Sequence, residues 1–166
     1  MMLPATSPLI EIVEAQEQDQ LKQVRLLFGE YFSELPQHLY FAHFDQELAS
    51  LPGEYAPPSG SLLLATVNGE AAACVGLRPY RGLAGACEMK RLYVRPAFRG
   101  LKLGRLLVQR VIDAARARGY RRLRLDTHPP TMQAAVTLYE RLNFVTVTDV
   151  PDAIPSLVYM ELDLLA

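Results

Sequence analysis

The stretch ACEMKRLYVRPAFRGLKLGRLL spans residues 86–107 of the 166-residue chain. Its pattern predicts a strand over residues 87–94, a loop over residues 95–100, and a helix that opens near Leu101. The first N–H groups of a helix lack partners, and the helix dipole adds about half a positive charge there. A basic, glycine-containing loop at a helix N-terminus therefore predicts a phosphate-binding site.

The other predicted elements follow from the spacing of apolar residues on both sides of this stretch. We expect strands at residues 9–15, 61–67, 70–77, 121–127, 143–147 and 157–162. We expect helices at residues 19–35, 101–118 and 129–142, and a short helix with one face formed by Phe41, Phe44, Leu48 and Leu51.

Two connections between these elements indicate how the strands pair. Asn68-Gly69 joins two strands and is the dipeptide most typical of a tight hairpin, because both residues tolerate positive φ. The crossover through the helix at residues 101–118 is long enough to imply parallel pairing of the strands on either side. We therefore expect an α+β fold in a single domain over residues 1–166, with a mixed, mostly antiparallel sheet and helices on both faces.

Charge is unevenly distributed along the chain, although the formal net charge is only −1. Residues 1–60 carry nine acidic and two basic side chains, whereas residues 78–124 carry fourteen basic and two acidic ones. The basic segment favours a small polyanionic ligand, and the acidic segment weakly favours a cationic acceptor. Nucleic acid is the competing partner, and we expect none, because aromatic residues do not alternate with the arginines.

Composition also bears on location. No apolar run approaches the roughly 20 residues that span a bilayer, and the N-terminus lacks the pattern of a signal peptide. Cys74 and Cys87 lie in apolar, strand-like runs, which predicts two buried, reduced thiols. We therefore expect a cytoplasmic protein with no membrane partner. Three scattered histidines and these two cysteines do not have the spacing of metal ligands, so we expect no metal.

Two local motifs carry a resemblance to a known family. The first is Arg99-Gly100-Leu101-Lys102-Leu103-Gly104, which matches the pattern Q/R-x-x-G-x-G/A except that Lys102 replaces the middle glycine. The second runs from Ala135 to Phe144 and matches A-x-x-L-Y-x-x-x-G-F, with Asn143 in place of glycine. Together, and in their predicted contexts, they resemble the GNAT superfamily of acetyl-CoA-dependent N-acetyltransferases over essentially the whole chain. Met132 stands where that family often has asparagine.

The resemblance implies a GNAT-like acyl-CoA N-acyltransferase fold in which the fourth and fifth strands splay apart around acetyl-CoA. It places the pantetheine arm on the backbone of Leu92, Tyr93 and Val94. It places the pyrophosphate on Arg99, Gly100, Leu101, Lys102, Leu103, Gly104 and Arg105. A free N–H group of the fourth strand could also polarise the thioester carbonyl.

The resemblance further implies a primary amine as acceptor and two catalytic side chains. Glu88, the only acid between Glu70 and Asp113, matches a glutamate that acts as general base; the alternative is an ion pair with Lys90 or an arginine. Tyr139 matches the tyrosine that protonates the departing thiolate; the alternative is an aromatic ring packed under the cofactor.

Several points stay open. Arg78 and Arg81 could hold a carboxylate of the acceptor. His128 could be a second base or could contact the acceptor, although a solvated loop histidine is the simpler interpretation. The acceptor could be a small-molecule amine or a protein amine, and the chain could be a monomer or a homodimer. A CoA-binding sensor module without transfer activity is the alternative function.

Overall fold

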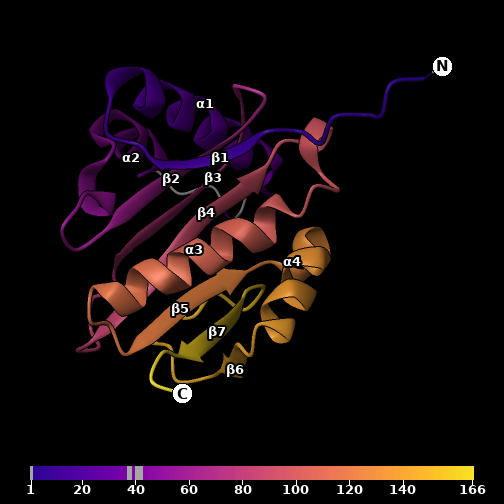
Figure 1. The fold of residues 1–166 in the computed structure, drawn as a ribbon. Helices are drawn as coiled ribbons and strands as arrows, with labels where there is room; N and C mark the ends of the chain where they lie inside the picture. Colours follow the sequence, from indigo (N-terminus) through magenta and orange to yellow (C-terminus); the bar gives the residue numbers. More distant parts are fainter. Residues whose placement is uncertain (1, 37–38, 40–42) are drawn as a thin grey trace.

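A computed structural model describes residues 2–36, 39 and 43–166 of the chain. Its strands are β1 (Ile10–Glu14), β2 (Ser61–Val67), β3 (Glu70–Pro79), β4 (Ala86–Val94), β5 (Arg122–Thr127), β6 (Val145–Val147) and β7 (Val158–Asp163). Its helices are α1 (Gln18–Glu34), α2 (Phe44–Ser50), α3 (Leu103–Ala117) and α4 (Pro129–Arg141), with short 3-10 turns η2 (Gly53–Tyr55) and η3 (Pro96–Phe98) (Figure 1). This is the order of helices and strands that the sequence predicts.

The seven strands form one sheet in the order β1-β2-β3-β4-β5-β7-β6. β4 and β5 are parallel, and every other neighbouring pair is antiparallel. α3 provides the crossover that parallel neighbours require. The predicted α+β class, the mixed sheet and the Asn68-Gly69 hairpin are confirmed, and these two turn residues have φ of 50° and 84°.

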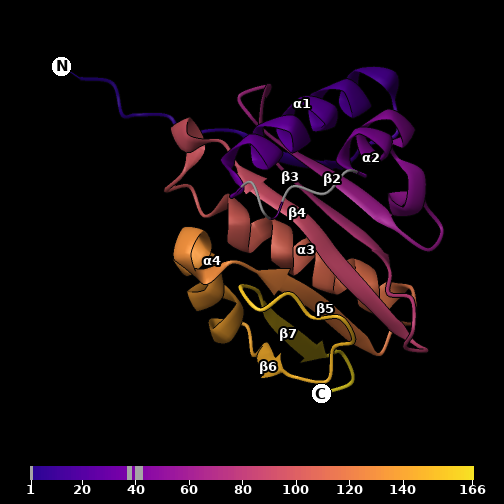
Figure 2. The ribbon, with the colours of Figure 1, turned by 180° about the vertical axis from the view of Figure 1, so that it is seen from behind.

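Helices cover both faces of the sheet, as predicted. α3 lies in front of the sheet in Figure 1 and behind it in Figure 2, and its apolar stripe packs with α4 into one buried cluster. Residues of α1 and α2 form a second buried cluster against the opposite face. Cys74 and Cys87 are free and buried, one in each cluster. Among the described residues, none of the helices combines the length and the apolar character needed to cross a membrane.

Some boundaries differ from the predicted ones for local physical reasons. α3 begins at Leu103 rather than near Leu101, because Lys102 adopts the left-handed conformation with φ of 61°. β6 begins at Val145, since Asn143 has φ of 73° and ends the preceding helix in the left-handed region. Phe41 lies outside the described residues, so the short second helix is described only as the seven residues of α2.

A β-bulge interrupts the pairing of β3 with β4. Between the pairs Cys74–Tyr93 and Gly76–Lys90, β4 contains one more residue than β3. Arg91 lies in this segment with φ of 62°, a conformation that costs an L-residue roughly 1–2 kcal/mol. A bulge bends and twists its strand, so the register shift redirects β4 just before its C-terminal end.

Gly76 generates the first prediction, because a Cβ there would lie 2.6 Å from ring carbons of Tyr55. Tyr55 is 1% exposed and packs edge-on against Phe28, so the ring has little room to move. We expect Gly76→Ala to lower the free energy of unfolding by about 1–3 kcal/mol in urea denaturation.

Gly29→Ala is the matched control for this substitution. Gly29 sits inside α1, and a Cβ there would have no atom within 4 Å apart from its chain neighbours and the backbone of the same helix. Alanine should therefore raise the free energy of unfolding there by about 0.5–1 kcal/mol. Equal shifts of the same sign in Gly76→Ala and Gly29→Ala would contradict the close approach of Tyr55.

Candidate active site

β4 and β5 separate where their backbone pairing stops. The paired residues are Ala86–Arg122, Cys87–Leu123 and Glu88–Arg124. Beyond Glu88, a cavity of about 410 Å³ opens between the strands, lined by residues 89–94 of β4 and 125–127 of β5. Side chains from α1 and α4 complete its walls. Within the described chain no strand pairs with residues 89–94 on their β5 side, so this edge of β4 can meet a ligand.

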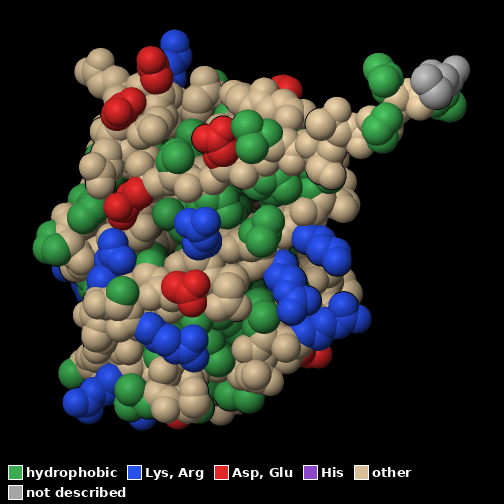
Figure 3. Space-filling model, in the orientation of Figure 1, with side chains coloured by type: hydrophobic (Ala, Val, Ile, Leu, Met, Phe, Trp, Pro, Cys, Tyr) green, Lys and Arg blue, Asp and Glu red, His purple; other side chains and the backbone are tan. Residues whose placement is uncertain are grey.

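The residues expected to hold a cofactor fall into two groups. Five of them line the cavity: Leu92, Tyr93, Val94, Arg99 and Gly104. The other five lie in the adjoining loop and first turn of α3: Gly100, Leu101, Lys102, Leu103 and Arg105. The Leu103 side chain is 1% exposed, so only its backbone could meet a ligand. Figure 3 shows Lys and Arg side chains gathered beside the start of α3 and over α4.

The loop before α3 requires left-handed backbone at two positions. Gly100 has φ of 96°, which glycine adopts without strain. Lys102, which replaces a glycine of the motif, has φ of 61° and ψ of 28°, so the loop keeps a glycine-like path. Arg99 Nε donates to the carbonyl oxygen of Val94 at 3.1 Å, and the Arg99 guanidinium lies 3.6 Å from the Glu34 carboxylate.

Tyr139 of α4 lines the cavity and is 5% exposed. Burial raises the pKa of its hydroxyl above the ordinary value, so the group stays protonated at neutral pH. Its ring packs at 5.6 Å from the ring of Phe144. The Tyr139 ring is therefore packed in the core, and its side chain, with a protonated hydroxyl, forms part of the cavity wall.

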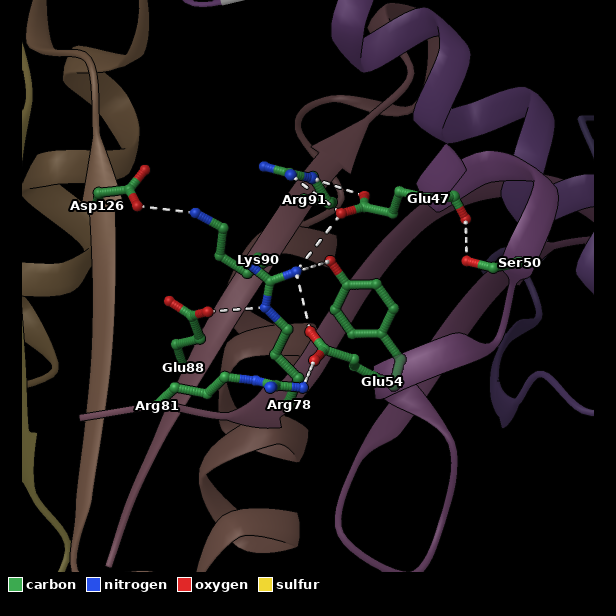
Figure 4. Close-up of polar contacts among 10 residues, drawn as sticks. Glu47, Ser50, Glu54, Arg78, Arg81, Glu88, Lys90, Arg91 and Asp126 are labelled. Carbon is green, nitrogen blue, oxygen red and sulfur yellow. Dashed lines mark hydrogen bonds and ion pairs between the residues drawn. The ribbon is translucent and has the colours of Figure 1, made fainter. Parts of the chain in front are cut away.

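Glu88 lies on β4 with a side chain that is 17% exposed, and it is outside the residues that line the cavity. Its Oε1 accepts a hydrogen bond from Arg78 Nε at 2.7 Å. Figure 4 shows Glu88 next to Lys90, on the side of β4 that faces Asp126. The ion pair with an arginine is therefore present, and the role of Glu88 as a base stays a prediction.

Arg78 and Arg81, which could have held an acceptor carboxylate, are occupied by carboxylates of the chain itself. Arg78 lies within 4 Å of Glu47 and Glu54 in addition to its bond with Glu88. Arg81 forms an ion pair with Glu54. The cavity between β4 and β5 is not lined by either arginine. A role in binding an acceptor would require these ion pairs to break.

An ion pair that the sequence did not reveal spans the gap between β4 and β5. Lys90 Nζ lies 2.8 Å from Asp126 Oδ2, and the two side chains are 13% and 27% exposed (Figure 4). Burial by itself would raise the pKa of Asp126, but Lys90 and nearby arginines lower it below its usual value. The parallel register of β4 and β5 explains this pair. Glu88 pairs with Arg124, so two residues further along each strand Lys90 lies opposite Asp126.

A second cavity of about 100 Å³ adjoins the first on the side of α1 and α2. The two cavities share several residues, among them Tyr31, Lys90, Arg91 and Asp126. His128 lines the second cavity and is 6% exposed, with Nδ1 at 2.8 Å from Thr131 Oγ1. The expectation of a solvated histidine is therefore wrong, because β5 ends beneath the start of α4. Among the described residues, no group of three His, Cys, Asp or Glu side chains is arranged to hold a metal.

Comparison with known proteins identifies the family. Residues 21–144 match the model of the acetyltransferase (GNAT) family. The chain belongs to the GNAT family. An uncharacterised N-acetyltransferase of Schizosaccharomyces pombe is 40% identical over 99% of both chains. A GNAT acetyltransferase structure from Staphylococcus aureus Mu50 superposes with a TM-score of 0.76, at 17% identity over 94% of this chain and 99% of that one.

GNAT acetyltransferases use acetyl-CoA, and the site suits that molecule. A Salmonella typhimurium acetyltransferase solved with acetyl-CoA superposes with a TM-score of 0.67, at 21% identity over 93% of this chain and 94% of that one. In this GNAT chain, an unpaired β4 edge leads to the N-terminus of α3 and to basic side chains. A peptide-like arm and a pyrophosphate need these two features in this order. The chain is thus a GNAT N-acetyltransferase whose acceptor is uncharacterised.

The lowered pKa of Asp126 predicts how the stability of this GNAT chain depends on pH. A carboxyl whose pKa is lowered on folding contributes stability above its unfolded pKa, about 3.9, and loses it as pH falls through the folded value. We expect Asp126→Asn to be less stable than wild type by about 1–3 kcal/mol at pH 7, because Lys90 loses its partner. This difference should shrink as the pH falls below about 4, toward the lowered pKa of the folded protein.

Urea denaturation at several pH values measures this difference. Asp113→Asn is the control, because Asp113 is exposed on α3 and contacts only Gln109 in the described hydrogen bonds. A difference between wild type and Asp126→Asn that stays constant, or grows, on acidification would show that Asp126 is not held ionised by Lys90.

Proposed function

We propose that the protein transfers the acetyl group of acetyl-CoA directly to a primary amine of a small-molecule acceptor, with no covalent enzyme intermediate. The observation that carries this proposal is the meeting of the two cavities at Lys90, Arg91 and Asp126. A donor in the larger cavity and an acceptor in the smaller one would meet at this junction. The smaller cavity, of about 100 Å³, has room for the amine end of a small acceptor.

The chain offers distinct groups to each part of the donor. The free edge of β4 at Leu92, Tyr93 and Val94 would hydrogen-bond the pantetheine amides. The N–H groups at the start of α3, with Arg99, Lys102 and Arg105, would hold the pyrophosphate. Arg99 would exchange Glu34 for phosphate oxygens, which form stronger charge-assisted bonds. Bound acetyl-CoA supplies an electrophilic thioester carbonyl and a thiol leaving group.

Two side chains would move the protons. The acceptor nitrogen forms a bond to the carbonyl carbon, the carbon–sulfur bond breaks, and the electron pair leaves with sulfur. Tyr139 would give its hydroxyl proton to that sulfur and recover it from solvent. Glu88 would take the proton that the amine loses, through water, since its carboxylate is outside the cavity wall. The products are an N-acetylated amine, CoA and one proton.

The primary test is release of CoA thiol from acetyl-CoA in the presence of a panel of small amines. We expect release with at least one amine, and a rise in melting temperature when acetyl-CoA alone is added. A rise in melting temperature with no thiol release for any amine would favour a binding module without transfer activity. The absence of both effects would contradict acetyl-CoA binding itself.

Tyr139→Phe should lower kcat by roughly tenfold at neutral pH. The effect is modest because a thiol of pKa about 8.5 leaves fairly well without help. Tyr120→Phe is the matched control, since Tyr120 donates its hydroxyl to the carbonyl oxygen of Ser59 at 2.6 Å and lies outside both cavities. Equal kcat values for Tyr139→Phe and wild type would show that Tyr139 does not protonate the departing thiolate and only packs in the wall of the cavity.

Glu88→Gln should lower kcat/KM for the amine by about 10²-fold or more below pH 8, with the deficit shrinking as the amine loses its own proton. The measurement is a pH–rate profile from about pH 6 to about pH 9 on Glu88→Gln and wild type. Parallel profiles with equal rates would show that Glu88 only orients Arg78.

A further inference from the structure

The junction of the two cavities carries fixed charges of both signs. Lys90, Arg91 and Asp126 line both cavities, so each would be within reach of an acceptor at the junction. Two of these side chains are cations, and the third is a carboxylate. A single ammonium would find one attractive and two repulsive groups there. A ligand with an anion and a cation close together complements all three.

Arg91 is the most firmly held of these groups. Its side chain is 9% exposed, and Glu47 accepts hydrogen bonds from Nε at 2.9 Å and from Nη2 at 3.1 Å. The guanidinium also lies 4.8 Å from the ring centroid of Phe44 and 5.2 Å from that of Phe32. Figure 4 shows the remaining nitrogen pointing away from Glu47, toward the side on which β5 lies. A fixed guanidinium with an N–H edge directed this way is suited to bind a carboxylate.

Asp126 provides the opposite charge at a short distance across the gap. Lys90 donates a hydrogen bond to its Oδ2 atom, and Oδ1 accepts none from the described residues. Oδ1 could therefore accept a hydrogen bond from an ammonium while Lys90 remains in place. Lys90, which lines both cavities as Arg91 does, adds a second positive charge to the junction.

Most of the remaining wall of the smaller cavity is apolar, and His128 and Thr127 are its polar exceptions. Beyond the charged junction, its walls include Leu35, Leu39, Phe44, Ile154, Leu157 and Tyr159. These side chains would bury an aliphatic or aromatic group of modest size at a gain of about 25 cal/mol for each Å² removed from water. A charged group on the acceptor's own side chain would lose its hydration among these apolar groups.

We infer that the acceptor is a small, apolar α-amino acid or a close analogue of one. Arg91 and Lys90 hold its carboxylate, Asp126 receives its ammonium, and the apolar walls take its side chain. This assignment rests on the proposed N-acetyl transfer and names the acceptor for the same site. The product is an N-acetyl amino acid, released with CoA and one proton.

Matched acceptors test this assignment on the wild-type protein. Thiol release is measured with L-leucine, L-leucinamide and 3-methylbutylamine, and with L-phenylalanine and 2-phenylethylamine. We expect kcat/KM for each amino acid to exceed that of its carboxylate-free partner by about tenfold or more, as one buried charge-assisted pair would give. Equal or faster transfer to the amines would overturn the inference and leave N-acetyl transfer intact. Thiol release with none of these compounds would overturn the inference, and the amine panel then decides whether transfer itself fails.

Variants locate the preference in the structure. Arg91→Met should reduce the ratio of leucine to 3-methylbutylamine kcat/KM to about one, mainly through a higher KM for leucine. If Arg91→Met fails to fold because Glu47 is left unpaired, the double variant Arg91→Met with Glu47→Gln removes both charges.

Arg95→Met is the matched control for these variants. Arg95 also binds a glutamate through two nitrogens, at 3.0 and 2.8 Å from Glu30, but lines neither cavity. It should keep the wild-type preference. Loss of the preference in Arg95→Met, or its retention in the Arg91 variants, would overturn the assignment of the carboxylate to Arg91.

Discussion

The separation of β4 from β5 is the constraint on which the rest of the site depends. Parallel strands in the middle of a sheet ordinarily continue their hydrogen bonds, and here the pairing stops at Glu88 and Arg124. Unpaired backbone in a buried position is costly, so the gap needs other partners. Lys90 and Asp126 connect the strands through side chains instead, and the bulge at Arg91 redirects β4. What remains open is a cavity with a polar peptide edge, which is what an extended amide-containing ligand requires.

The uneven charge along the chain has a structural origin that composition alone could not show. Acidic residues of the segment 1–60 pair with basic residues of the segment 78–124. The pairs are Glu14–Arg118, Glu30–Arg95, Glu34–Arg99, Glu47–Arg78, Glu47–Arg91, Glu54–Arg78 and Glu54–Arg81. Much of the basic charge is therefore neutralised within the fold. The acidic segment favours α1 and α2 docking on β3 and β4 rather than a cationic acceptor.

The fold could be predicted from the sequence because its signals are local. Apolar spacing, the Asn68-Gly69 turn and the loop before α3 each depend on a few neighbouring residues. The partners of Arg78 could not be predicted in this way, since Glu47 and Glu54 come from another part of the chain. The same limit hid the burial of His128. The Lys90–Asp126 pair could be predicted once the parallel register of β4 and β5 is known. The register that places Arg124 beside Glu88 also places Asp126 beside Lys90.

Two basic residues with positive φ belong to the segments that we propose hold acetyl-CoA and the acceptor. Lys102 precedes α3 with φ of 61°, and Arg91 occupies the bulge of β4 with φ of 62°. Glycine would adopt either conformation without the roughly 1–2 kcal/mol that an L-residue loses there. Strain of this kind persists where the surrounding structure fixes it, and it is concentrated at functional sites. The positive side chains are thus kept at both positions despite this cost, which is consistent with one facing phosphates and the other facing the acceptor.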